Sequence, residues 1–145
     1  MGKPDLETMT EKFVVVGVDG SEAALRAVDW ATDEARYRGA ELRVVHASLL
    51  EHHVLAEPLL ADEVRRESAI VRTAVERARL RSREVAVKAL TVDPPTAASL
   101  IQASVGAELL VVGSRGLNRM QELLLGSVSR ECVVGARCSV LVVRD

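Results

Sequence analysis

The chain has 145 residues, of which 48% are apolar and 28% are charged, and its formal net charge is −2. This length is that of one ordinary domain, and this composition is that of a globular protein with a buried core. The small net charge excludes a general electrostatic attraction to nucleic acid or to anionic membranes. Aromatic residues make up only 2% of the chain, which argues against an aromatic platform for single-stranded nucleic acid.

The first twelve residues are polar and charged. They lack the apolar core of a signal peptide, and no apolar run approaches the roughly 20 residues that span a bilayer. We therefore expect residues 1–12 to be a flexible lead-in to a single domain over 13–145, and the protein to be cytoplasmic, with no membrane contact. The two cysteines, Cys132 and Cys138, are too few for a metal or disulfide framework, and we interpret them as reduced thiols.

Five short apolar runs, rich in valine, predict five strands. The first of them, 13–18, is apolar without alternation, which is typical of a strand covered on both faces in a parallel sheet. The expected strands span 13–18, 42–47, 85–92, 109–112 and 140–143.

Helical patterns separate these strands. Apolar residues recur at helical spacing, and glycines at 39 and 106 provide helix ends. The expected helices lie within 24–39, 61–83, 93–106 and 127–136. Strands that alternate with helices predict an α/β fold, an open parallel sheet with right-handed crossovers and helices on both faces. Ligands of such sheets bind beyond the carboxyl ends of the strands, where the strand order reverses.

The most informative stretch follows the fourth expected strand. An apolar run stops at Gly113, Gly116 follows, and Gly126 and Ser127 precede the last helix, with the spacing Gly-x2-Gly-x9-Gly-Ser. Glycine lets a backbone approach a phosphate closely, and the first N–H groups of a helix are unpaired and attract anions. The spacing alone is a moderate signal, and it matches neither the Walker loop nor the Gly-x-Gly-x-x-Gly fingerprint.

With these glycines, the chain resembles the universal stress protein family in its ATP-binding branch. The resemblance extends over nearly the whole chain, because matching segments occur in the same order at 18–21 (Val-Asp-Gly-Ser), 44–47 (Val-Val-His-Ala) and 140–143 (Val-Leu-Val-Val). It implies a Rossmann-like fold of the adenine nucleotide alpha hydrolase type, with five parallel strands in the order 3-2-1-4-5. It also implies ATP as ligand, Mg²⁺ held through the phosphates, and a homodimer formed through the last strand.

The resemblance carries the family's site residues to two loops and the strand ends beside them. Asp19 is expected to contact adenosine and Ala47 to pack on adenine, and the glycine loops are expected to hold the phosphates. The positions implied are Gly17, Asp19, Ala47, Val112, Gly113, Arg115, Gly116, Gly126, Ser127, Val128 and Ser129.

Two of these residues have a simpler interpretation. Asp19 stands where a helix cap is needed for the helix that starts near Ser21. Arg115 pairs with a phosphate or is an ordinary solvated arginine of a loop, and the weaker candidate Arg119 lies in the insert between the glycines.

Other polar features are interpreted as structural. Two adjacent histidines, His52 and His53, do not easily face one metal ion, and no third ligand is evident. His46 matches a histidine common in the family and is interpreted as structural. The arginines between 65 and 83 are interleaved with Asp62, Glu63 and other acids, as on a solvated helix face, so we expect no nucleic-acid binding.

Three hypotheses for function remain. The first, implied by the resemblance, is an ATP-binding stress-response module whose state is read by an unidentified regulatory partner. The second is a slow ATPase or a self-phosphorylating protein, although no dedicated general base is evident. The third is a dimeric stress scaffold that binds no nucleotide, against which the complete glycine pattern argues.

Overall fold

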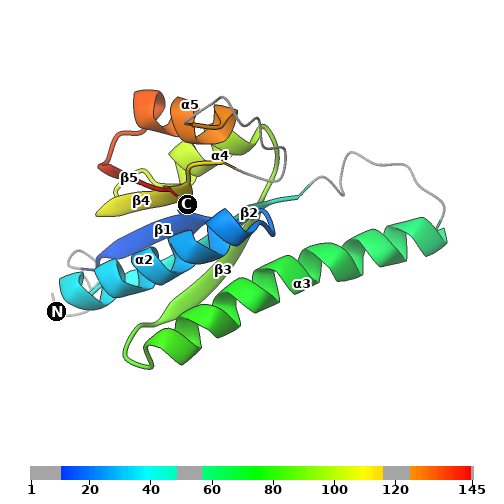
Figure 1. Cartoon of the computed structure of the whole chain (residues 1–145), viewed down its shortest axis with the longest axis horizontal. Coiled ribbons are helices and arrows are strands. Elements are labelled where there is room, and N and C mark those ends of the chain that lie inside the picture. The colour runs from blue at the N-terminus through cyan, green and yellow to red at the C-terminus, as the bar shows by residue number, and fades with distance from the viewer. Residues whose placement is uncertain (1–10, 49–56, 116–124, 145) are drawn as a thin grey trace, which may run out of the picture.

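The computed structural model describes residues 11–48, 57–115 and 125–144, with side chains from residue 61 onward in the second range. In this part of the chain five strands alternate with four helices (Figure 1). The strands are β1 (Phe13–Gly17), β2 (Glu41–Ala47), β3 (Val87–Val92), β4 (Leu109–Gly113) and β5 (Val140–Val143). The helices are α2 (Glu22–Arg38), α3 (Glu57–Arg81), α4 (Thr96–Ala103) and α5 (Ser127–Gly135).

The strands form one parallel sheet in the order β3-β2-β1-β4-β5. The central strand β1 pairs with β2 from Phe13↔Glu41 to Gly17↔Val45, and with β4 on its other side. After β3 the chain crosses to the far side of β1, so the strand order reverses there. The expected α/β class and the strand order implied by the resemblance are both confirmed.

Each face of the sheet carries its own core. Helices α2 and α3 cover one face and α4 and α5 cover the other (Figure 1). Along β1, Val14 and Val16 point into the first core and Val15 into the second, and all three are fully buried. This two-sided burial explains why β1 is apolar without alternation.

Both ends of α2 follow the sequence. The side chain of Ser21 accepts a hydrogen bond from the N–H of Ala24 at 3.1 Å and caps the first turn. Gly39 adopts the left-handed conformation at the other end, with φ 64°, and its N–H bonds to the last carbonyls of the helix. Glycine is favoured there because a Cβ is strained at positive φ.

Two forked ion pairs join α3 to α2. Arg77 donates from Nε and Nη2 to the carboxylate oxygens of Asp29, at 2.8 and 2.7 Å, and Arg81 makes the same fork to Asp33 at 2.8 Å for both bonds. The hydrogen bond from Arg81 lowers the pKa of Asp33, and the bond to Asp29 raises the pKa of Arg77. Part of the arginine run is therefore paired between helices.

Burial along α3 is uneven. Ala74 and Ala78 are fully buried against the sheet. In contrast, none of the residues 61–73 is fully buried, and Val64 is 42% exposed. The helix is thus packed through its C-terminal half.

Among the boundaries that differ from the expectation, two element starts have a clear reason. Helix α3 begins at Glu57 rather than at residue 61, because Pro58 lies in the first turn, where proline does not interrupt a helix. Strand β3 begins at Val87 rather than at residue 85. Val85 is 6% exposed and belongs to the core from a turn, so its apolar character does not mark a strand.

Candidate functional site

The loops that follow β1 and β4 lie side by side at the reversal of strand order. Their strands are hydrogen-bonded neighbours, and the start of α2 touches the end of β4. A Cβ built on Gly113 would lie 3.0 Å from the Cβ of Ala23 and 3.1 Å from its backbone carbon and oxygen. Gly113 is therefore required by the close approach of α2.

The loop after β1 is a tight, hydrogen-bonded turn. The N–H of Val18 donates to the carbonyl of Val45 at 2.9 Å. The carboxylate Oδ1 of Asp19 accepts from the N–H of Ser21 at 2.9 Å, while Ser21 is itself the N-cap of α2. Asp19 thus takes part in the turn before the helix but is not its cap, so the simpler interpretation as a helix cap is wrong. Its other oxygen, Oδ2, makes no hydrogen bond within the described residues.

The loop after β4 is closed onto the start of α5 through one carbonyl group. The carbonyl of Ser114 accepts from the N–H of Gly126 and from the hydroxyl of Ser129 at 2.9 Å. Ser129 is 2% exposed, so its hydroxyl belongs to this closure rather than to the surface. The structure thereby brings together Ser114, Gly126 and Ser129, which are twelve and fifteen residues apart in sequence.

The N-terminus of α5 has no side-chain cap. Its N-cap is Gly126, with φ −75° and ψ 172°, a conformation open to any residue. Ser127, the first helical residue, is exposed and Val128 is half-buried. Within the described ranges, no side-chain cap serves the first-turn N–H groups of α5, whereas the side chain of Ser21 serves one such group of α2, that of Ala24.

The remaining predicted positions lie at strand ends or beyond the described residues. Gly17 ends β1, where an added Cβ would lie 2.8 Å from Cδ1 of Leu100. Ala47 ends β2 and is half-buried. Val112 is 3% exposed and belongs to the α4/α5 core, so only its backbone faces the loop end. Arg115 is half-buried, and Gly116 and Arg119 lie outside the described residues.

Sequence reasoning gave His46 no position in the site, but the structure places it directly behind the Asp19 loop. Its Nδ1 lies 2.9 Å from the carbonyl oxygen of Val18, and its Nε2 lies 3.4 Å from Oε1 of Glu67 on α3. The signal for its position was a histidine one residue from the end of β2, directly after two buried valines.

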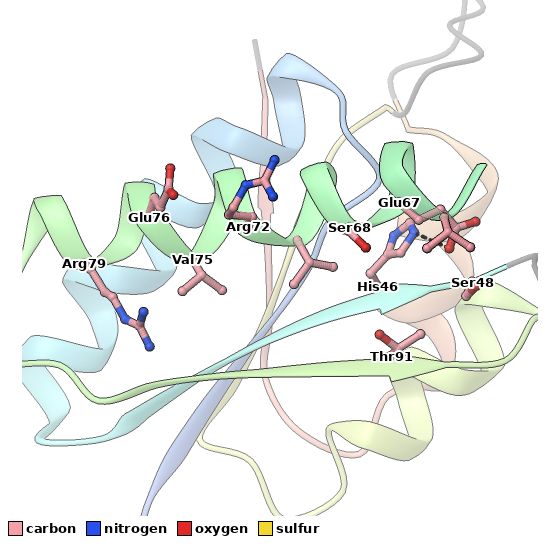
Figure 2. A pocket seen from close by; sticks show the side chains of 11 residues that line it. His46, Ser48, Glu67, Ser68, Arg72, Val75, Glu76, Arg79 and Thr91 are labelled. Atoms are coloured by element: carbon pink, nitrogen blue, oxygen red, sulfur yellow. Dashed lines mark ion pairs between the residues drawn. The ribbon is translucent and has the colours of Figure 1, made fainter. Parts of the chain in front are cut away.

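A cavity of about 460 Å³ lies between α3 and the strands β2 and β3 (Figure 2). His46, Ser48 and Thr91 form its strand side, and α3 contributes a mixture of valines and charged residues. The α3 residues that line it are Val64, Glu67, Ser68, Val71, Arg72, Val75, Glu76 and Arg79. Its size is that of a small-molecule pocket, but the Gly113 loop does not line it.

Other reactive groups are inert or lie elsewhere. Burial raises the pKa of the Cys132 thiol to about 11, and Cys138 is also a free thiol. Among the described residues no three potential metal ligands come together, and His52 and His53 lie outside them. No helix within the described ranges is long and apolar enough to cross a membrane.

The fold and the two loops define an α/β protein of the kind that binds ligands at a switch point of the strand order. Residues 11–144 match the model of the universal stress protein family, and the chain belongs to that family. A universal stress protein of Thermus aquaticus is 36% identical over 142 residues, which cover 92% of this chain and 98% of the relative. One from Mycobacterium tuberculosis is 34% identical over 138 residues, which cover 94% of this chain but only 49% of the relative.

Solved structures show the same fold. A universal stress protein in complex with cAMP is 32% identical, has a TM-score of 0.71, and is matched over 92% of this chain and 97% of its own. A universal stress protein from Lactobacillus plantarum is 22% identical with a TM-score of 0.75, over 92% and 97% of the two chains. The second likeness bears on the fold alone.

Proposed function

We propose that this domain binds an adenine nucleotide, ATP with Mg²⁺, and acts as a regulatory module whose nucleotide state is read by partner proteins. Adenosine lies near Asp19 and Ala47, and the phosphates lie on the loop from Gly113 to Ser129. The domain proper is residues 13–145, preceded by the lead-in 1–12.

The observation that carries this proposal is the uncapped N-terminus of α5 beside the Gly113 loop. The closure through Ser114 fixes the first turn of α5 next to the end of β4. Its N–H groups, which no side chain of the described residues caps, then form a preorganised anion site at the positive end of the helix dipole. Asp19 stands on the neighbouring loop with Oδ2 available for a ribose hydroxyl or an adenine amine.

The chemistry of the donors fits ATP with its metal. Backbone N–H groups and Arg115 suit phosphate oxygens, and Mg²⁺ is commonly held by substrate phosphates and water with few protein ligands. No acidic cluster among the described residues competes for the ion. The relative solved with cAMP, at 32% identity, supports an adenine nucleotide as the ligand class.

Calorimetric titration with Mg-ATP tests the proposal and should give saturable binding. Gly126→Val should abolish it, because a side chain would obstruct the phosphates, while the φ of −75° leaves the backbone unstrained. Glu131→Val, at an exposed position of the same helix, is the matched control and should bind normally. Absence of wild-type binding at millimolar ATP would favour the nucleotide-free scaffold instead.

Turnover should be very slow. Asp19 is the one carboxylate among the described residues of the two loops, and its Oδ1 is already engaged by Ser21. These residues therefore supply no base positioned on an attacking water. A multiple-turnover rate near ordinary enzyme values, about 10 per second, would contradict a purely regulatory function.

We also propose a homodimer through β5, because this edge offers unpaired backbone groups to a second copy. Leu110 N–H donates to the carbonyl of Ser139 at 2.9 Å, and Ser114 N–H donates to that of Val143 at 2.8 Å. In a parallel pair of strands, every second residue of one strand bonds to the other strand. Ser139 and Val143 bond toward β4, so the N–H and C=O groups of Val140 and Val142 point away from the sheet. An uncharged edge of this kind pairs readily with another chain.

Apolar side chains flank this edge on both faces of the sheet. Trp30, 53% exposed, lies two helical turns after Ala23 and therefore on the side of α2 that faces β4 and β5. On α5, Gly135 faces Ile101 of α4, and Val133, two residues earlier and 49% exposed, lies on the opposite flank. A two-fold axis beside β5 brings both side chains into the interface.

Light scattering tests the dimer with a matched pair of proline variants. Val142→Pro removes one outward donor of β5 without breaking its ladder to β4, and should yield a monomer. Ala89→Pro removes the equivalent outward donor of β3 at the other edge, and should remain a dimer. A wild-type monomer at micromolar concentration, or equal effects of the two variants, would contradict pairing through β5.

A further inference from the structure

We propose that His46 and Glu67 share one proton and act as a positioning pair that holds the Asp19 loop in its nucleotide-binding shape. The proposal rests on the nucleotide function proposed above and adds the residues that make the affinity depend on pH.

The carbonyl of Val18 determines which ring nitrogen of His46 carries hydrogen. A carbonyl oxygen only accepts, so the contact of 2.9 Å requires an N–H on Nδ1. In the neutral ring Nε2 is then a bare acceptor. This atom is buried and makes no hydrogen bond with any described residue.

The group that faces Nε2 is a carboxylate, which is also an acceptor. Oε1 of Glu67 lies 3.4 Å away, and the side chains of His46 and Glu67 are only 9% and 16% exposed. Figure 2 shows the ring rising from β2 toward Glu67 on α3, with the contact drawn between them. Two acceptors do not face each other in a partly dry site unless one proton lies between them.

Among the residues that the structure describes around His46, Glu67 is the immediate partner of that proton. From α3, Arg72, Glu76 and Arg79 line the same cavity farther along the helix, and β2 and β3 contribute Ser48 and Thr91, which do not titrate in this range. Asp19, in the loop after Val18, is turned to the N–H of Ser21.

The pair matters because the same part of α3 braces the Asp19 loop. Gly20, next to Asp19, has a φ of +89°, and a Cβ built on it would lie 3.2 Å from Cγ1 of Ile70 on α3. Glu67 and Ile70 are three residues apart and lie on one face of the helix. The loop is therefore held from behind at Val18, through His46, and at Gly20, through Ile70.

Loss of the proton should loosen this brace. The lone pair of Nε2 then faces the carboxylate, Glu67 turns toward solvent, and residues 61–73 of α3, none of them fully buried, move away from the loop. The bond from Nδ1 to Val18 survives in the neutral ring. Nucleotide affinity should accordingly fall as the pH rises and the shared proton is lost.

The test measures the affinity for cAMP from about pH 5.5 to about pH 8.5, with Mg-ATP titrated in parallel. The phosphodiester of cAMP does not change charge in this range, and the ionisation of ATP is common to all variants. Wild type should bind about fivefold more weakly at the alkaline end.

Three variants separate the two contacts of His46. Glu67→Gln supplies an amide N–H to the bare Nε2 at every pH, so the affinity should stay at the acidic wild-type level without pH dependence. His46→Asn keeps a donor for Val18 but loses the Glu67 contact, so it should bind at the alkaline wild-type level at every pH. His46→Ala loses both contacts and should bind more weakly than either.

Each outcome decides one question. An unchanged pH profile in Glu67→Gln overturns the proton-sharing pair while the nucleotide function stands. Failure of the wild type to bind either nucleotide at any pH overturns the nucleotide function itself. Titration of the His46 ring by NMR in nucleotide-free protein adds a direct readout, since Glu67→Gln should shift the midpoint if the pair shares a proton.

Discussion

Helix α3 meets the rest of the molecule differently along its two halves. The C-terminal half buries Ala74 and Ala78 and is pinned to α2 by the forks from Arg77 and Arg81. The N-terminal half has no fully buried residue between 61 and 73. It contacts β2 through Glu67 and the Asp19 loop through Ile70. Stability is thus concentrated at one end, and contact with the candidate nucleotide loop at the other.

The largest expected effect compares one substitution placed in each half. Ala78→Asp buries an unpaired carboxylate in a fully buried position and should lower the free energy of unfolding by about 3 kcal/mol or more. Val64→Asp, where the side chain is 42% exposed, should change it by at most about 1 kcal/mol. Urea unfolding followed by circular dichroism measures both, and similar losses would show that the two halves are equally packed.

The next effect concerns the forked pairs. Arg77→Met should lower the free energy of unfolding by about 1 kcal/mol, because Asp29, with a side chain 21% exposed, keeps only a 3.8 Å contact with Arg81. Arg72→Met, in the same helix at an exposed position, should change it by a few tenths of a kcal/mol. A double-mutant cycle with Asp29→Asn isolates the pair, and a coupling energy of zero would remove the fork as an anchor.

Acid should weaken the anchor in the C-terminal half of α3. The hydrogen bond from Arg81 lowers the pKa of Asp33 in the folded protein. Its stabilisation is therefore complete above the unfolded pKa of about 3.9 and is lost as the pH falls through the lowered folded value. Because this pair is partly exposed, the loss should be a few tenths of a kcal/mol. Between about pH 6 and 3, the difference in unfolding free energy between wild type and Asp33→Asn should narrow toward the acidic end; a constant difference would contradict the assignment.

The smallest effect is expected at the exposed end. Arg65 and Asp62 form an ion pair one helical turn apart, with side chains 71% and 56% exposed. Arg65→Gln should change the free energy of unfolding by about 0.3 kcal/mol or less, and added salt should erase the difference. A larger change would mean that this half of α3 has tertiary contacts that its exposure does not indicate.

Local patterns predicted most of the fold because they reflect burial. The continuous valines of β1 and the glycine at the end of α2 are visible in the sequence, and they predicted the buried strand and the helix end. The unequal packing of α3 was not predictable, since Val64, Ile70 and Val75 continue one amphipathic pattern along the helix. That pattern is the same whether or not a strand lies beneath them. Strand order came from the family resemblance, because pairing between distant strands has no local signature.

The candidate site was predictable as two loops but not in the use of its groups. Glycine spacing and family resemblance identified Gly113 and Gly126. That Ser129 turns its hydroxyl to Ser114, and that His46 reaches back to Val18, depends on loop closure between residues 15 and 28 positions apart. Residue types at a spacing indicate what a loop is able to bind, and the tertiary contacts decide which groups remain available.

The contact between Gly113 and Ala23 has a consequence for how sequences of this kind are compared. A protein that keeps α2 against β4 in this way should tend to keep glycine at 113 whether or not it binds nucleotide, because a Cβ there would lie 3.0 Å from Ala23 and would push the helix outward. At Gly126 the backbone itself does not demand glycine, since a φ of −75° suits any residue. As lineages diverge, the first glycine should therefore persist as a mark of helix docking. Drift at the position of Gly126 is the better sign that nucleotide binding has been abandoned.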